Sequence, residues 1–155
     1  MKHLDCERYV EAVLFAHKTI SNGIAAARAN SLAKHKEALG TSIVGGERKD
    51  PTAQEAMKRL DPIPVLKCIE GGKTFLIHQP EKWLEVFNKS FQTFRNRYGD
   101  KHTDMLEKRY LEGKDTATLA EETGISRKRY GERRSVFLNI VMIYAAQYGL
   151  IKLDE

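Results

Sequence analysis

Apolar residues recur at intervals of three and four positions in the first part of the chain, the spacing of one face of an α-helix. This pattern predicts a helix over residues 5–21. The tripeptide Ser21-Asn22-Gly23 predicts a break or kink, and the alanine-rich residues 24–39 predict a second, weaker helix. Residues 40–50 predict a loop, after which Asp50-Pro51 has the N-cap and first-position chemistry of a new short helix.

Two apolar runs follow, separated by a pair of glycines. Pro62 and Pro64 end the short helix, and the runs on either side of Gly71-Gly72 alternate in the manner of paired strands. A two-residue glycine connection is a typical hairpin turn. The pattern therefore predicts one small β-hairpin, over about residues 65–77, in an otherwise helical protein.

The longest amphipathic pattern begins near the middle of the chain. Gln79-Pro80-Glu81 predicts its start, and Tyr98-Gly99-Asp100 predicts its end. A stripe of large side chains at this spacing occurs in nucleic-acid-binding surfaces as well as in cores, and core packing is the favoured interpretation. The stripe consists of Trp83, Leu84, Phe87, Phe91, Phe94 and Tyr98.

Beyond residue 104 the pattern changes to short helices joined by tight turns. One helix is predicted to end at Gly113, and Thr116 is predicted to cap the next one. The last apolar stretch, residues 136–148, keeps helical spacing up to Gly149, a typical stop signal. A helix this apolar is expected either between the N-terminal helices or at a dimer interface, and burial in the core is favoured.

The spacing within residues 119–130 fits a helix-turn-helix. Ala120 is small enough for a second helix to cross close to it, and Gly124 suits the left-handed backbone of a tight turn. Ser126 is predicted to cap the second helix, which would be the recognition helix. The predicted packing residues of the motif are Leu119, Ala120, Gly124, Ile125 and Tyr130.

Positive charge follows this turn directly. Residues 127–134 contain five cations and one acid. Cations at a helix N-terminus oppose the helix macrodipole, so an anionic partner is the better explanation, although a solvated basic face is the alternative. The first residues of a recognition helix reach into the major groove, and neighbouring cations contact phosphates. The predicted base contacts are Arg127, Lys128 and Glu132, next to the cap Ser126, and the predicted phosphate contacts are Arg129, Arg133 and Arg134.

Composition narrows the class of protein. With 155 residues, 41% of them hydrophobic and 30% charged, the chain has the make-up of a globular protein of one domain or two small lobes. We interpret it as a mainly α helical bundle, with an N-terminal lobe over 1–99 and a helix-turn-helix lobe over 100–155. A net charge of +5 permits a polyanionic partner. No apolar run of membrane-spanning length and no secretory signal is seen, so we expect a cytoplasmic protein.

Catalytic and metal-binding patterns are not found. The 5 histidines are scattered and show no ligand spacing with cysteines or carboxylates. The segment Glu70-Gly71-Gly72-Lys73 lacks the further glycines and the Ser or Thr of a phosphate-binding loop. We therefore predict that the chain is not an enzyme and needs no cofactor or metal.

With these residues in view, segment 105–148 resembles region 4 of bacterial sigma factors and related phage regulators, and it looks most like the ArpU/RinA type. The resemblance is carried by Tyr110-Leu111-Glu112-Gly113-Lys114, by residues 119–126 and by Tyr130. Proteins of that type are phage-encoded transcriptional activators of late genes. The resemblance implies a regulator that binds double-stranded DNA at a promoter and helps to recruit host RNA polymerase. A homodimer is the arrangement expected if the last apolar helix lies at an interface.

Two alternatives stay open at this point. A phage packaging or assembly protein, such as a small terminase subunit, also joins a DNA-binding helix-turn-helix to an oligomerising helical region. In the other alternative, the sigma-like lobe contacts RNA polymerase instead of DNA.

Overall fold

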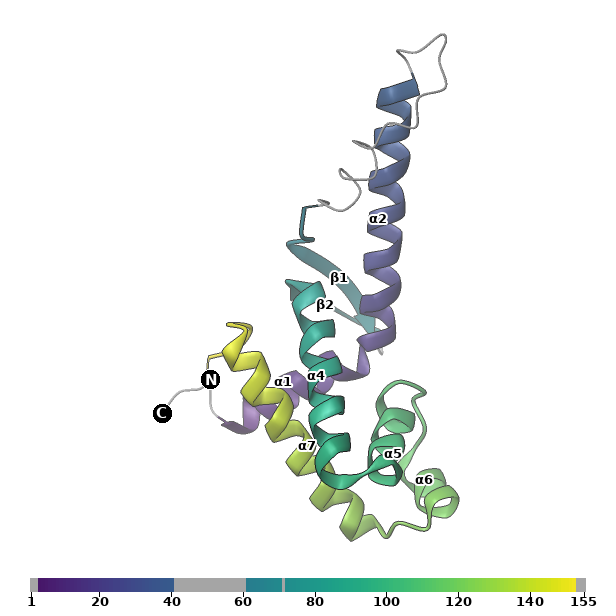
Figure 1. Cartoon of the computed structure of the whole chain (residues 1–155), viewed down its shortest axis with the longest axis vertical. Coiled ribbons are helices and arrows are strands. Elements are labelled where there is room, and N and C mark those ends of the chain that lie inside the picture. Colours follow the sequence, from purple (N-terminus) through teal and green to yellow (C-terminus); the bar gives the residue numbers. More distant parts are fainter. Residues whose placement is uncertain (1–2, 41–60, 71, 153–155) are drawn as a thin grey trace.

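The protein is mainly helical with one antiparallel hairpin, which confirms the predicted fold class. The computed structural model describes residues 3–40, 61–70 and 72–152 (Figure 1). The predicted loop over 40–50 and the predicted short helix from Asp50 lie outside these ranges, apart from residue 40 itself. The elements are α1 (His3–Phe15), α2 (His17–Gly40), β1 (Val65–Glu70), β2 (Lys73–His78), α4 (Pro80–Tyr98), α5 (Asp100–Tyr110), α6 (Thr116–Thr123) and α7 (Arg127–Gln147).

The first two helices meet earlier in the chain than predicted. The junction is at Ala16, which is fully buried, and not at Ser21-Asn22-Gly23. Gly23 lies inside α2, where a Cβ atom would come within 2.7 Å of the Leu66 side chain. The glycine therefore allows β1 to pack closely on α2, and it does not end a helix.

The hairpin has the predicted position, with one more residue at its end. Gly72 has a φ of 76°, a left-handed conformation that glycine adopts without strain. Cys68 pairs with Phe75 in the register, and the side chains of Cys68 and Ile77 are buried. On the opposite face, Ile69 is 64% exposed and Leu76 is 54% exposed.

The aromatic stripe of α4 is part of the core, as predicted. Pro80 occupies the start of α4, after Gln79 in a left-handed conformation. Trp83, Phe87, Phe91 and Phe94 are buried, whereas Leu84 and Tyr98 are half-buried at the edge of the core. Phe91 and Phe94 both contact the ring of Phe137 in α7, with ring centroids 4.7 and 5.5 Å apart.

Helix α7 packs against both α4 and α1, so most of its apolar side chains lie in the core or at its edge, whereas Ile143 is 54% exposed (Figure 1). This confirms core burial for the last apolar stretch. The predicted lobes 1–99 and 100–155 do not have separate cores, because buried residues of α1, α4 and α7 form one continuous cluster. The buried residues of α7 are Phe137, Leu138, Val141, Met142 and Ala145.

In the part of the chain that the structure describes, no helix has the length and apolar character needed to cross a membrane.

Candidate nucleic-acid interface

Helix α6 begins with a capped first turn. The cap is Asp115, one residue before the predicted Thr116, which is the first residue of the helix. A carboxylate oxygen of Asp115 accepts a hydrogen bond of 2.8 Å from the backbone N–H of Thr118, and the other accepts one of 3.0 Å from its hydroxyl. The bond from the Thr118 backbone holds the pKa of Asp115 below its usual value. The cap fixes where α6 starts relative to α5.

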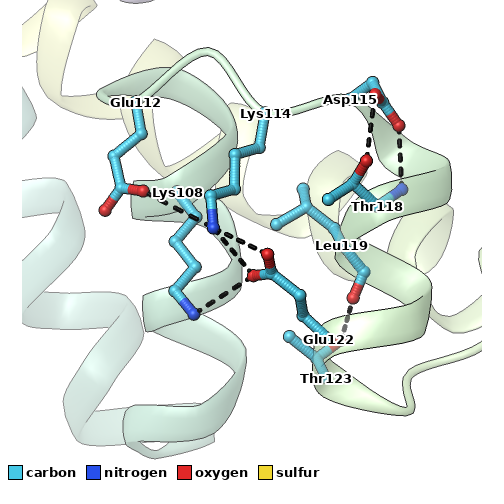
Figure 2. A network of polar contacts seen from close by, with 8 residues as sticks. All are labelled: Lys108, Glu112, Lys114, Asp115, Thr118, Leu119, Glu122 and Thr123. Atoms are coloured by element: carbon cyan, nitrogen blue, oxygen red, sulfur yellow. Dashed lines mark hydrogen bonds and ion pairs between the residues drawn. The ribbon is translucent and has the colours of Figure 1, made fainter.

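A group of ion pairs ties α6 to α5, as Figure 2 shows. Lys114, in the loop after α5, donates to both carboxylate oxygens of Glu122 at 2.8 and 2.9 Å. Lys108 of α5 lies 3.5 Å from the same carboxylate. The hydrogen bond from Lys114 lowers the pKa of Glu122. The carboxylate of Glu122 therefore holds α6 against α5 and the loop that follows it.

The turn between α6 and α7 has the predicted chemistry. Gly124 has a φ of 66°, and its N–H donates to the carbonyl oxygen of Ala120 at 3.0 Å. Ile125 is only 6% exposed and fills the space beneath the turn. Ser126 caps α7, because its Oγ accepts a hydrogen bond of 3.2 Å from the N–H of Arg129. The turn and the cap thus confirm the helix-turn-helix geometry.

The remaining packing residues of the motif are also placed in or beside the core. Leu119 is 1% exposed, and Ala120 next to it is partly buried. Tyr130 is half-buried against the core, and this burial raises the pKa of its hydroxyl.

The first turn of α7 presents cations to solvent. Arg127, Lys128 and Arg129 are all exposed, and so is Glu132 one turn later. Within the described ranges, none of the three cations takes part in an ion pair. No acidic residue lies in the first turn of α7, so the positive end of the helix dipole and these cations are uncompensated there.

Arg133 is directed toward the corner between α4 and α5. Its guanidinium lies over the ring of Tyr98, 4.2 Å from the ring centroid. The Nε atom is buried and has no hydrogen-bond partner among the residues that the structure describes. The side chain is therefore held by stacking on Tyr98, and no acid holds it.

Arg134 has a different role from the predicted phosphate contact. Its Nε donates to a Glu11 carboxylate oxygen at 2.7 Å, its Nη2 donates to the other oxygen, and Nη1 lies 3.4 Å from Glu7. Tyr110 donates a further hydrogen bond of 2.9 Å to Glu11. Burial opposes ionisation of Glu11, but the bonds from Arg134 and Tyr110 outweigh it and lower its pKa. Arg134 thus joins α7 to α1, and we do not include it in the interface.

The structure adds cations that the sequence interpretation did not include. Lys101, in the first turn of α5, is exposed. His102 beside it has a lowered pKa, because it is partly buried and Arg133, Arg129 and Lys101 surround it. The dense run of basic residues from 95 to 101 is the sequence signal that could have indicated this surface.

In the described parts of the chain, no group of three or more His, Cys, Asp or Glu side chains is placed to hold a metal ion.

No protein-family model matches the sequence, and neither a curated protein nor a solved structure is significantly similar to the chain.

Proposed function

We propose that the protein binds double-stranded DNA in a sequence-specific manner and acts in transcriptional control, with α7 as its recognition helix. The observation that carries the proposal is the set of three exposed cations, Arg127, Lys128 and Arg129, at the start of a helix that follows a tight glycine turn. Like charges at the positive end of a helix dipole are unfavourable unless an anion compensates them. A duplex supplies such an anion along its whole length.

The arrangement of the helices suits a groove. Figure 1 shows α6 and the start of α7 together at one end of the molecule, away from the free end of α2. The major groove of B-DNA, about 12 Å wide, admits one α-helix. With α7 in the groove, Arg127 and Lys128 would reach acceptor atoms of guanine, and Glu132 would accept from cytosine N4. Arg129 would contact a phosphate.

The type of regulator is proposed from the resemblance of residues 105–148 to the ArpU/RinA type. On that basis the protein would bind upstream of phage or prophage late genes and help to recruit host RNA polymerase. The fixed attachment of α7 to the core favours a protein that presents one rigid surface to DNA.

The proposal is tested by selecting duplexes from a random pool with the full-length protein and titrating the selected and a scrambled duplex at several salt concentrations. We expect one enriched motif, bound roughly a thousandfold more tightly than the scrambled duplex. Arg127→Gln should weaken binding to the selected duplex by about 10- to 100-fold and relax the preference at one base pair. Lys82→Gln, an exposed cation in the first turn of α4, is the matched control.

Two outcomes would overturn the proposal. One is weak, steeply salt-dependent binding with no enriched sequence, which would indicate phosphate contacts alone. The other is an unchanged duplex affinity for Arg127→Gln together with lost binding to purified RNA polymerase, which would assign this surface to the polymerase.

A further inference from the structure

Four cations from three helices gather beside the start of α7. Two belong to the corner where α4 ends and α5 begins, and two belong to the first two turns of α7. Arg97 and Arg133 both lie over the ring of Tyr98. Arg133 also belongs, with Arg129 and Lys101, to the cations whose charge lowers the pKa of His102. We name this group the corner clamp; it consists of Arg97, Lys101, Arg129 and Arg133.

We propose that the corner clamp is a second phosphate-binding surface, which holds the DNA backbone next to the groove that α7 enters. This inference rests on the proposed function and adds residues of α4 and α5 to the interface. Lys101, Arg97 and Arg129 are exposed, as a contact to a phosphate requires. Arg and Lys contacts to phosphates set the position of a protein on the duplex and carry no sequence information.

The acids of this corner all lie near one other cation, Arg95. Asp100, Asp104 and Glu107 of α5 lie 3.7, 3.5 and 2.8 Å from the guanidinium of Arg95. Arg95 thus gathers the carboxylates of the first two turns of α5. The five cations of this corner, Arg95 and the four members of the corner clamp, outnumber its three carboxylates. Among the described residues, no ion pair includes a member of the corner clamp. Its field would therefore attract a polyanion.

Stacking on Tyr98 holds two of the guanidinium groups in place. Arg133 lies 4.2 Å and Arg97 lies 5.5 Å from the centroid of the Tyr98 ring. A cation over an aromatic face is attracted to the ring, and its orientation becomes restricted. Side chains that are ordered before binding lose less conformational entropy when a ligand arrives. Arg133 and Arg97 therefore resemble a preformed binding surface more than free surface cations do.

The guanidinium of Arg133 over Tyr98 brings α7 to the corner of α4 and α5, and His102 is affected by cations of both α5 and α7. The cations that lower its pKa come from α5 (Lys101) and from α7 (Arg129 and Arg133). Glu132 is the acid nearest in sequence to the two α7 cations. Glu132 projects about 100° away from Arg133 around the helix axis. It shares a helix face with Arg129, three residues before it, but no ion pair joins the two among the described residues. A phosphate bound between α5 and α7 would thus have cations on both sides.

The test uses the full chain with Lys101→Gln and, separately, Arg97→Gln, with Lys82→Gln as the control. Each variant is titrated with the selected and the scrambled duplex at several salt concentrations, after its melting temperature has been compared with that of the wild type. We expect both duplexes to lose affinity by the same factor. The slope of log affinity against log salt should decrease in magnitude by about 0.9 for each phosphate that the variant no longer neutralises.

The outcomes separate the corner clamp from the proposed function. If the wild type binds duplex DNA and both variants behave like Lys82→Gln, the corner clamp is wrong and the proposed function stands. A loss confined to the selected duplex would also overturn the clamp, because it would indicate base contacts. If the wild type binds no duplex, both proposals fall.

Discussion

Replacing Arg134 with methionine would test whether this residue is a structural cation. The variant keeps a long side chain over α1 but removes the guanidinium that faces Glu11 and Glu7. The side chains of Arg134, Glu11 and Glu7 are 29%, 19% and 22% exposed, so the two ion pairs are intermediate between a surface pair and a buried pair. Surface pairs contribute at most about 1 kcal/mol, and breaking a buried pair costs about 3–5 kcal/mol. We expect a loss of about 2 kcal/mol, which is roughly a thirtyfold change in the folding equilibrium constant.

The loss should depend on pH. The pKa of Glu11 is lowered in the folded protein from its ordinary value of 4.5, so the pair stabilises the fold above that pH. The contribution disappears as the pH falls through the lowered folded-state pKa. In Arg134→Met, only the hydrogen bond from Tyr110 and the charge of Arg109 remain to oppose the effect of burial on the pKa of Glu11. The difference in unfolding free energy between the variant and the wild type should therefore shrink as the pH is lowered from 7 toward 3.

Urea denaturation followed by circular dichroism at several pH values measures this difference. Arg127→Met, at the exposed end of the same helix, is the matched control and should change stability by less than about 0.5 kcal/mol. Equal stabilities of the two variants at pH 7 would refute the structural role. Duplex titration of folded Arg134→Met should leave the salt dependence unchanged, and a slope smaller by about 0.9 would return Arg134 to the phosphate contacts.

Three further predictions concern the turn, and each is measured by the free energy of unfolding in urea. Gly124→Ala should destabilise the protein by about 1–2 kcal/mol, because residue 124 has a left-handed backbone. The control Gly131→Ala lies inside α7, where a Cβ meets nothing within 4 Å, and should stabilise the protein by about 0.5–1 kcal/mol. Changes of the same sign in the two variants would contradict the prediction. Ile125→Ala should cost about 2–4 kcal/mol, and a loss below about 1 kcal/mol would show that Ile125 does not hold the turn. Ser126→Ala should cost about 1 kcal/mol through the lost cap, and an unchanged stability would argue against it.

The features that could be predicted from the sequence are those set by neighbouring residues. The hairpin follows from two apolar runs around Gly71-Gly72, and the turn follows from the backbone preferences of Gly124 and Ser126. The prediction of a break at Gly23 is wrong, because a glycine inside a helix looks like a break when its partner is unknown. The partner is Leu66, which is 43 positions further along the chain.

Long-range charge pairing accounts for the part of the site that could not be predicted. In the sequence, Arg134 looks like any other cation at the start of a basic helix. Its acidic partners cannot be recognised there, because they lie 123 and 127 positions away in α1. Lys101 and Arg129 both act on the pKa of His102, although they lie far apart in the sequence. Exposure and pairing along a helix depend on which elements cover it, and periodicity alone does not contain that information.

The continuity of α7 means that the helix-turn-helix is not a detachable module. A fragment that starts at residue 100 would leave the core-facing side of α7 in water, since α1 and α4 cover it in the whole protein. In the part of the chain that the structure describes, α2 contacts α4 and β1 and shares the core with α7. Its 24 residues span about 36 Å, and it extends away from the start of α7 (Figure 1). On the proposed duplex, the base sequence would therefore set the angular position of α2 around the DNA axis. A partner held by α2 would be placed at a defined phase of the double helix.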